Sequence, residues 1–274
     1  MNHKTRQAAL SYIILSFLCI FSFFPFFWML MSSLKDETQI FHLTLFPSAP
    51  TLDNYKFILF SKYSKFSIWF ANSIFVALFT TASVLFFDSL LGYTLAKFTF
   101  PGKKLIFLLI MSTLMIPTEM LVIPWYSLSV SLRWVDTHWG IMFPGLMSAF
   151  GVFLMRQFMG SIPDDLLDAA RIDGQSEFRI FVTVVLPLVG SALATLAIFN
   201  FIGNWNAFLW PLIIASKPTT FTLPVGLANF SGEAGSDWHL IMTGASVAMA
   251  PLIVVFLVFQ QRIIKGITLS GMKG

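Results

Sequence analysis

Charged residues are scarce in this sequence. Of its 274 residues, 11% are charged and 57% are hydrophobic, whereas a soluble domain typically carries about 25% charged residues. A long chain this apolar has too few polar side chains to cover its own surface, so we expect a lipid bilayer to be its solvent. The net charge of +4 is small and spread along the chain, which argues against nucleic acid as a partner.

The residues that enzymes and metal sites need are also nearly absent. The single cysteine, Cys19, lies in an apolar run, which excludes an internal disulfide and a metal site made of several cysteines. The four histidines are scattered without metal-ligand spacing, and there is no G-x-x-x-x-G-K-[ST] phosphate loop. Ser246, in a Gly-Ala-Ser run, is followed by no histidine that could take its proton. We therefore expect no catalytic residues, no bound metal or cofactor, and no ATP hydrolysis by this chain alone.

Long apolar runs are what the sequence contains instead. A membrane-spanning helix needs about 20 mostly apolar residues. The first run follows the basic start Met1–Gln7, but it is too long for a signal peptide and has no small-residue cleavage site. The connections between runs are too short for another domain, so we expect one transmembrane domain over residues 1–274 in an all-α membrane protein. Six windows qualify or nearly qualify as spans: about 9–32, 69–95, 105–130, 139–155, 186–213 and 239–260.

The distribution of lysine and arginine predicts the orientation. If the N-terminus is cytoplasmic, 11 of the 17 basic residues fall on the cytoplasmic side of the six spans, as the positive-inside rule requires. Four lysines in the first outer loop, between residues 35 and 65, run against this trend. We expect both termini to be cytoplasmic.

The connection 156–187 carries the most information. Pro163 fits the first turn of a helix, Asp164 and Asp165 then lie at its positive end, and Gly174 is well suited to end it. A second helix is expected from about Ser176 into the fifth span. The pattern predicts a short helix on the cytoplasmic face, a sharp turn and a return to the bilayer. Taken alone, it also fits an ordinary amphipathic helix at the membrane interface.

The spacing in this connection resembles the EAA signature of ABC importer permeases, which reads Glu-Ala-Ala, three residues, Gly, nine residues, Ile, one residue and Leu-Pro. Here Asp168 replaces Glu and Val184 replaces Ile, while the spacing is kept throughout. The resemblance extends over nearly the whole chain. The size of the chain and its number of spans resemble the smaller permease of maltose-type importers. Further stretches resemble the carbohydrate subclass: Gly92–Phe98 with Phe100–Lys104, Met115–Pro117 with Ile123-Pro124, Asn204–Leu212, Gln261-Arg262 with Lys265-Gly266, and Phe46-Pro47 with Leu52–Tyr55.

The resemblance implies a type I ABC importer permease fold with six spans and a cytoplasmic coupling helix. Its partners would be a second permease, two cytoplasmic ATPase subunits that bind ATP and magnesium, and an external sugar-binding protein. The setting would be a bacterial inner membrane, and the cargo a mono- or oligosaccharide. The residues that would dock into the ATPase are Asp168, Ala169, Ala170, Arg171, Asp173 and Gly174.

Polar residues inside the spans are candidates for the translocation path. Asn200 and Asn204 share one helix face, and the Trp205 ring beside them suits the apolar face of a sugar. The alternative is that the asparagines bond between helices. Glu119 lies well inside the third span, where a carboxylate is a functional candidate. Asp88 lies nearer the inner end of the second span, and we expect it to reach interfacial water or a lysine such as Lys97.

Two other functions remain open at this stage. A permease of the same type could carry a phosphorylated polyol such as glycerol phosphate, which would favour cations facing the path. No Lys or Arg lies in the middle of a span, but a partner permease could supply them. An ion-coupled secondary transporter would be expected to show two inverted halves with interrupted helices, and it would have no use for the EAA-like connection.

Overall fold

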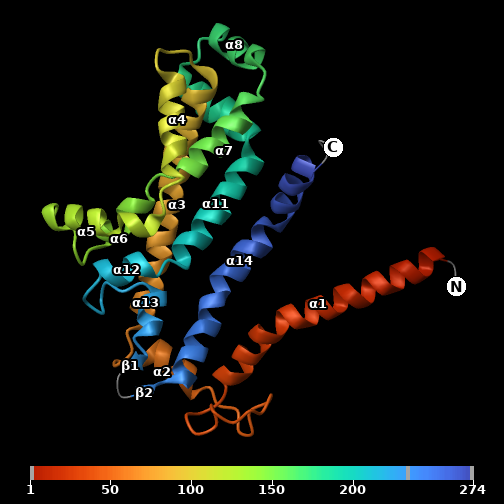
Figure 1. The fold of residues 1–274 in the computed structure, drawn as a ribbon, viewed down its shortest axis with the longest axis vertical. Helices are drawn as coiled ribbons and strands as arrows, with labels where there is room; N and C mark the ends of the chain where they lie inside the picture. Colours follow the sequence, from red (N-terminus) through yellow and green to blue (C-terminus); the bar gives the residue numbers. More distant parts are fainter. Residues whose placement is uncertain (1–2, 233–234, 272–274) are drawn as a thin grey trace. The chain divides into compact units, whose positions relative to one another are not determined.

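The chain is almost entirely helical. A computed structural model describes residues 3–232 and 235–271, and Figure 1 shows its order of elements. The two strands, β1 (Ser231–Gly232) and β2 (Gly235–Ser236), form one antiparallel pair. The helices and turns are α1 (His3–Ser33), α2 (Asp53–Phe60), α3 (Phe66–Lys97), α4 (Lys103–Thr113), η1 (Thr118–Leu121), α5 (Val122–Ser131), α6 (His138–Met142), η2 (Phe143–Gly145), α7 (Ala149–Gly160), α8 (Asp164–Ile172), α9 (Glu177–Ile180), η3 (Phe181–Val185), α10 (Leu186–Leu188), α11 (Gly190–Trp205), α12 (Leu209–Ile214), α13 (Leu223–Ala228) and α14 (Trp238–Gly271).

The helices form two compact units. One comprises residues 1–68 and 225–251, and the other comprises residues 69–224 and 252–274. The cytoplasmic location of both termini stays a prediction, because the terminal residues 1–2 and 272–274 lie outside the described residues. The side chains of the Gln261-Arg262 and Lys265-Gly266 motif are likewise outside what the structure describes.

In the first unit, the end of α1 is held by a buried lysine and an asparagine. The Lys35 side chain is 0% exposed, and its Nζ donates to the carbonyls of His42 at 2.9 Å and Thr44 at 2.7 Å. The side-chain amide of Asn54, at the start of α2, donates to the carbonyls of Ser33 and Lys35. The bond to Ser33 satisfies a carbonyl that the end of α1 leaves without a partner, while the two bonds from Lys35 fix the loop that follows. Lys35, one of the four lysines that break the charge trend, thus has a structural role.

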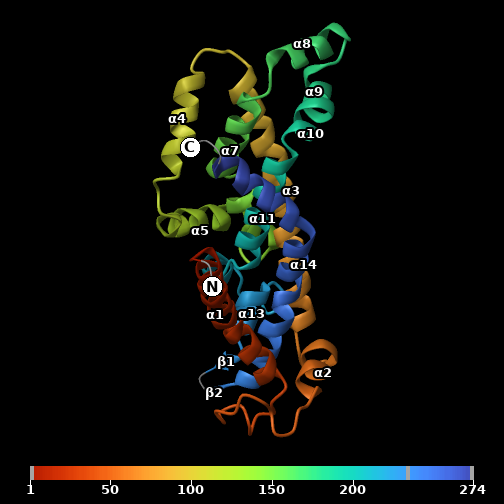
Figure 2. The same ribbon diagram turned by 90° about the vertical axis from the view of Figure 1, so that its right-hand side faces the viewer.

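The core of the second unit lies where α3, α7, α8 and α11 meet. Val84 and Tyr93 of α3, Met155 of α7, Phe181 of η3 and Leu196 of α11 are all buried in this cluster. Figure 2 shows α3 running along this unit, with α8 at one end of it. A smaller cluster joins α6 to α12. The elements that carry the candidate site are therefore packed on the largest core of this unit.

Three helices are long and apolar enough to cross a membrane, and three further spans are possible if each bent pair of helices counts as one. The continuous ones are Leu10–Ser33, Phe66–Lys97 and Trp238–Gln260. The bent pairs are Lys103–Thr113 with Thr118–Ser131, His138–Gly145 with Ala149–Gly160, and Glu177–Leu188 with Gly190–Trp205. Each of the six windows expected from the sequence overlaps one of these segments, but the fifth, expected over 186–213, is shifted, because the bent pair runs from Glu177 to Trp205.

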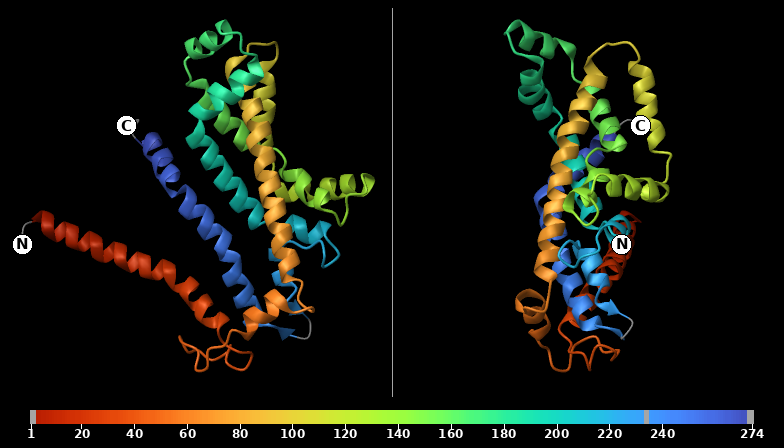
Figure 3. Two further views of the ribbon diagram at one scale, coloured as in Figure 1. Left: turned by 180° about the vertical axis from the view of Figure 1, so that it is seen from behind. Right: turned by 90° about the vertical axis from the view of Figure 1, so that its left-hand side faces the viewer.

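The bent pairs differ from the straight spans that apolar length suggests. The third span bends by 95° at Pro117, whose ψ of 129° takes the chain out of the helix, and Figure 3 shows α5 running across the direction of α3. The fifth bends by 83° at Val189, two residues after Pro187. Proline removes a backbone donor and clashes with the preceding turn, which explains breaks at these two positions.

Asp136 ties the α5–α6 connection to the segment that follows α12. Its carboxylate accepts from the amides of Ser216 and Lys217, each at 3.0 Å, and pairs with the Lys217 Nζ at 3.0 Å. Burial alone would raise the pKa of Asp136, but the hydrogen bonds from Lys217 and Ser216 outweigh it and lower the pKa from 3.8 to about 2. The carboxylate therefore stabilises this connection whenever it is ionised.

Replacing Asp136 by asparagine should lower the free energy of unfolding by about 1–2 kcal/mol at neutral pH, because a charged acceptor is lost. A lowered pKa gives stability that is complete above about pH 4 and is lost as the pH falls through about 2. Asparagine also tolerates the positive φ of 61° at this position. Thermal unfolding in one detergent should show the two proteins converging between pH 4 and pH 2. A difference that does not change with pH would contradict this role.

Candidate functional site

The short helix α8 is fixed to the core along one side. Leu167 and Ala170, three residues apart, are buried in the cluster that contains Tyr93, Met155 and Phe181. Spacing of three places them on one helix face. The helix that the sequence predicts in this connection is therefore present, and it is seated on the second unit.

Lys97, the last residue of α3, holds the beginning of α8. Its Nζ lies 2.7 Å from the Asp164 carboxylate and also donates to the carbonyl of Ile162. The Lys97 side chain is 7% exposed, whereas that of Asp164 is 75% exposed. The hydrogen bond from Lys97 lowers the pKa of Asp164, and the lysine's charge adds to this effect. This pair links α8 to the end of a membrane-spanning helix.

Arg171 ties the other end of α8 to the turn that follows. Its Nη1 lies 2.6 Å from Asp168 and its Nε lies 2.7 Å from Glu177. Glu177 in turn accepts a hydrogen bond of 3.0 Å from the Tyr93 hydroxyl on α3. The hydrogen bonds to Glu177 and then Asp168 raise the pKa of Arg171. The carboxylate of Asp168 is therefore already engaged within the chain, by a residue of the same motif.

Gly174 ends α8 as the sequence predicts. It has a φ of +77°, the left-handed conformation that glycine adopts at no steric cost. Its amide donates to the carbonyl of Arg171 at 3.0 Å, and the amide of Gln175 donates to Ala170 at 3.1 Å. These two bonds form a Schellman motif. No atom of the described chain lies within 4 Å of the position that a Cβ would occupy.

The side of α8 that faces away from the core carries exposed apolar residues. Leu166, Ala169 and Ile172 recur every three residues and are exposed, Ile172 at 86%. The sequence analysis singled out Ala169 but missed Leu166 and Ile172, although their spacing of three was a usable signal. Of the six predicted coupling residues, Ala170 points into the core, while Asp168, Ala169, Arg171, Asp173 and Gly174 are exposed.

Asn200 and Asn204 are joined to each other and to α3. The Nδ2 of Asn204 donates to the backbone oxygen of Asn200 at 2.9 Å and to its Oδ1 at 3.0 Å, and the hydroxyl of Thr81 donates to that Oδ1 at 3.2 Å. Trp205 is 2% exposed and packs on the rings of Phe70 and Phe201. In the isolated chain these contacts are those of helix packing.

Glu119 is not hydrogen-bonded to Asn200 or Asn204. It is exposed in the turn η1, between the two arms of the bent third span. The Glu119 carboxylate makes no hydrogen bond or ion pair in the part of the chain that the structure describes. The structure therefore does not join Glu119 to the two asparagines, and it places the carboxylate at a break in a membrane helix.

The expectation for Asp88 was wrong. Instead of reaching Lys97 or interfacial water, Asp88 is fully buried and accepts hydrogen bonds from the Ser148 amide and hydroxyl at 3.0–3.2 Å. Ser148 is the N-cap of α7 and accepts from the amide of Gly151. Lys97 is occupied by Asp164, and the freed amides of the broken fourth span offer the carboxylate closer donors. Asp88 thus holds the beginning of α7.

Comparison with protein families places this arrangement among known proteins. The family described as "Binding-protein-dependent transport system inner membrane component" matches residues 88–269. The matched region includes α8, the turn at Gly174 and the whole of α11.

Individual relatives match nearly the full length. The arabinooligosaccharides transport system permease protein AraQ of Bacillus subtilis is 38% identical, over 92% of this chain and 90% of that protein. The sn-glycerol-3-phosphate transport system permease protein UgpE of Yersinia enterocolitica is 32% identical, over 89% of this chain and 90% of that protein. A solved bacterial ABC transporter involved in the import of the acidic polysaccharide alginate has a chain with a TM-score of 0.84 and 23% identity, covering 95% of this chain and 98% of that chain. This last match shows a shared fold.

Proposed function

Because this chain belongs to the family of binding-protein-dependent transport system inner membrane components, we propose that it is the permease subunit of an ABC importer for a sugar. ATP hydrolysed by a separate subunit would drive the transport. The similarity to the arabinooligosaccharide permease supports an oligosaccharide as the cargo. The chain itself has no phosphate loop, so ATP and magnesium belong on the partner subunit.

The observation that carries this proposal is the geometry of α8. The helix is pinned to the unit at both ends, by Lys97 through Asp164 and by Glu177 through Arg171. Its opposite face presents Leu166, Ala169 and Ile172 without a covering element in the described residues. A rigidly held helix with an apolar outer face is suited to fill a groove on another subunit. We propose that this subunit is the ATPase, so that its closure moves α8 and, through Lys97, α3.

Lys97 and Tyr93 are the residues that would transmit the movement. Both belong to α3 and both bond to the α8 region, so a displacement of α8 reaches a membrane-spanning helix directly. The full assembly we propose contains two ATPase subunits, a second permease and a sugar-binding protein on the outer face. In this arrangement the coupling helix α8 lies on the cytoplasmic side, with both termini.

The charge pattern supports that orientation. Two of the four lysines that run against the positive-inside trend already have partners. The Nζ of the buried Lys35 donates to two carbonyls, and Lys56 pairs with Asp53 at 2.8 Å. The excess of Lys and Arg on the cytoplasmic side, 11 of 17, supports the orientation, and Lys35 is an exception that the fold explains. The setting we propose is the bacterial cell membrane.

We further propose that Glu119 faces the translocation path, because it is exposed at a break in a membrane helix and an intramembrane carboxylate is costly without a function. Asn200 and Asn204 would contribute amide groups along α11. Trp205 would support them by packing behind on Phe70. A second permease would complete the path from the other side.

The proposal is tested by purifying the tagged chain from its native membrane in a mild detergent and placing the complex in liposomes. We expect a second permease and an ATPase to co-purify, and we expect uptake of labelled oligosaccharide that requires ATP and the binding protein. Uptake driven by an ion gradient without ATP would contradict the proposal and favour a secondary transporter.

A phosphorylated polyol is the second candidate cargo, since UgpE of Yersinia enterocolitica is 32% identical over most of both chains. The two cargoes separate in the same liposomes. Competition by unlabelled glycerol 3-phosphate, with none by arabino-oligosaccharides, would assign the chain to the second cargo.

A further inference from the structure

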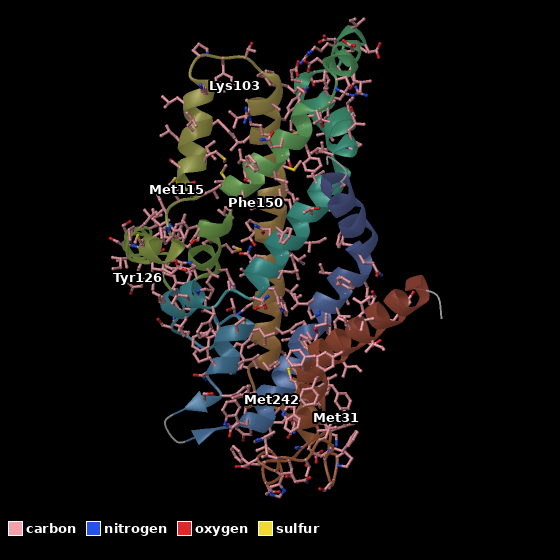
Figure 4. The ribbon with its side chains drawn as sticks, turned by 45° about the vertical axis from the view of Figure 1, so that its right-hand side comes forward. Met31, Lys103, Met115, Tyr126, Phe150 and Met242 are labelled. Carbon is pink, nitrogen blue, oxygen red and sulfur yellow. The ribbon has the colours of Figure 1, made fainter. Side chains whose placement is uncertain are left out.

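A cavity of about 960 Å³ opens between the beginning of α4 and the end of α7. Phe100 and Gly102 of the α3–α4 connection, the first turns of α4 and Arg156 of α7 line it. Figure 4 labels Lys103 at this end of the unit, where α8 also lies. The volume is in the range of cavities that hold small ligands, about 300–1,000 Å³. None of the coupling or path residues discussed above lines this cavity.

Three cations and no carboxylate line the cavity: Lys103, Lys104 and Arg156. The Nζ of Lys103 donates to the carbonyls of Ala96 and Phe98, which places its charge beside the end of α3. The Lys104 side chain has neither a hydrogen bond nor an ion pair in the described chain. No carboxylate among the described residues therefore neutralises the positive charge of this cavity.

Arg156 is held in place but keeps donors free. Its guanidinium lies 3.8 Å from the centre of the Phe107 ring, and its Nε donates to the carbonyl of Leu95 at 3.3 Å. Its two terminal nitrogens have no acceptor among the described residues. The free N–H groups of these two nitrogens form a rigid fork that matches the oxygens of a phosphate group. The beginning of α4 also has no acidic residue and no side-chain cap, so the helix dipole adds positive potential there.

The other walls of the cavity are apolar. Phe100, Phe107, Leu105 and Leu108 line it together with the cations, and Leu105 and Leu108 are exposed in the chain. On α4, Leu105 directly follows the two lysines and Leu108 lies one turn after Lys104, so an anionic group bound at the lysines would have apolar surface beside it along the same helix. A ligand that fits must be acidic at one end and apolar along the other.

We propose that this cavity binds an anionic phospholipid of the cytoplasmic leaflet. Its phosphate would accept hydrogen bonds from Lys104 and Arg156, and its acyl chains would lie along Leu105 and Leu108. A basic pocket between membrane helices at the cytoplasmic surface is a recognised kind of site for acidic lipid head groups. A zwitterionic lipid carries a second charge of opposite sign, which the three cations would repel.

The test is native mass spectrometry of the purified full chain with added phosphatidylglycerol. The variants are Arg156→Gln and Lys104→Gln, and the Lys104 side chain has no hydrogen bond or ion pair to lose in the described chain. The matched control is Arg179→Gln, an exposed arginine in α9 that removes one charge from the same end of the unit. Each of the first two variants should weaken phosphatidylglycerol binding about fivefold, and Arg179→Gln should not. Thermal unfolding of each variant shows whether it is folded.

Four results would overturn the proposal. Equal weakening by Arg179→Gln would show general attraction to a basic surface. Equal binding of phosphatidylcholine would show that the cations do not select the head group. Displacement of phosphatidylglycerol by millimolar inorganic phosphate would assign the cavity to a soluble phosphate. Retention of phosphatidylglycerol by folded Lys104→Gln at full affinity would likewise exclude the site.

Discussion

Replacing Gly174 by aspartate should abolish ATP-driven uptake while leaving the helices assembled. The position that a Cβ would occupy at Gly174 has no neighbouring atom in the described chain, so the new carboxylate meets nothing within its own subunit. In the proposed complex it would meet the ATPase at the turn where α8 ends. A charge buried at a docked surface typically costs 2 kcal/mol or more, and we expect uptake to fall about a hundredfold. Liposome uptake and ATP hydrolysis, measured together, check this.

Gly174→Asn is the matched control for Gly174→Asp. The φ of +77° at this position costs both residues about the same backbone strain, since each tolerates the left-handed region. Their side chains have nearly the same size and differ in charge. We expect the asparagine variant to retain clearly more uptake than the aspartate variant. Normal uptake by Gly174→Asp, with ATP hydrolysis still stimulated by substrate, would show that α8 does not dock where we propose.

Hydrogen exchange, measured on the same variants, shows whether α8 stays folded. The Schellman bonds involve the amides of Gly174 and Gln175, so hydrogen exchange of residues 164–175 reports whether the end of α8 survives a substitution. Protection should be similar in the two variants. If Gly174→Asp alone lost this protection, its transport defect would come from the chain's own fold and the docking explanation would fail.

The end of α8 could be predicted from sequence because its chemistry is local. Pro163 at the beginning and Gly174 after the end act through bonds that span at most five residues. The side of α8 that contacts the core was harder to predict. Ala170 belongs to the same motif as Ala169, yet one is buried and the other exposed, and only the position of α3, α7 and η3 decides which.

The bends in the spans were not predictable from proline alone. Pro25 and Pro251 lie inside the continuous helices α1 and α14, whereas Pro117 lies at a 95° bend. A proline leaves a carbonyl without its donor, and whether the helix continues depends on what satisfies that carbonyl. The break before α7 has another origin, since Ser148 caps the helix there and Asp88 holds Ser148. That partner lies 60 residues away in the sequence, beyond the reach of any local pattern.

Replacing Asp88 by alanine should therefore be among the most destabilising changes in the membrane region. The carboxylate is fully buried and accepts from both the amide and the hydroxyl of Ser148. Its removal leaves these donors without an acceptor in an apolar setting, and we expect a loss of about 3 kcal/mol in the free energy of unfolding. Ser89→Ala is the matched control, because Ser89 is the next residue, is equally buried, and has a hydroxyl without a hydrogen-bond partner among the described residues. This control should be neutral or slightly stabilising in the same unfolding measurement.

A double-mutant cycle with Gly151 shows whether Asp88 acts where the structure places it. A Cβ at Gly151 would overlap a carboxylate oxygen of Asp88, so Gly151→Ala should destabilise the parent protein by about 1–3 kcal/mol. In the Asp88→Ala background that overlap is gone, and the same substitution should cost much less. The two effects should thus be coupled by more than 0.5 kcal/mol. Strict additivity, or equal losses from Asp88→Ala and Ser89→Ala, would mean that Asp88 does not anchor the beginning of α7.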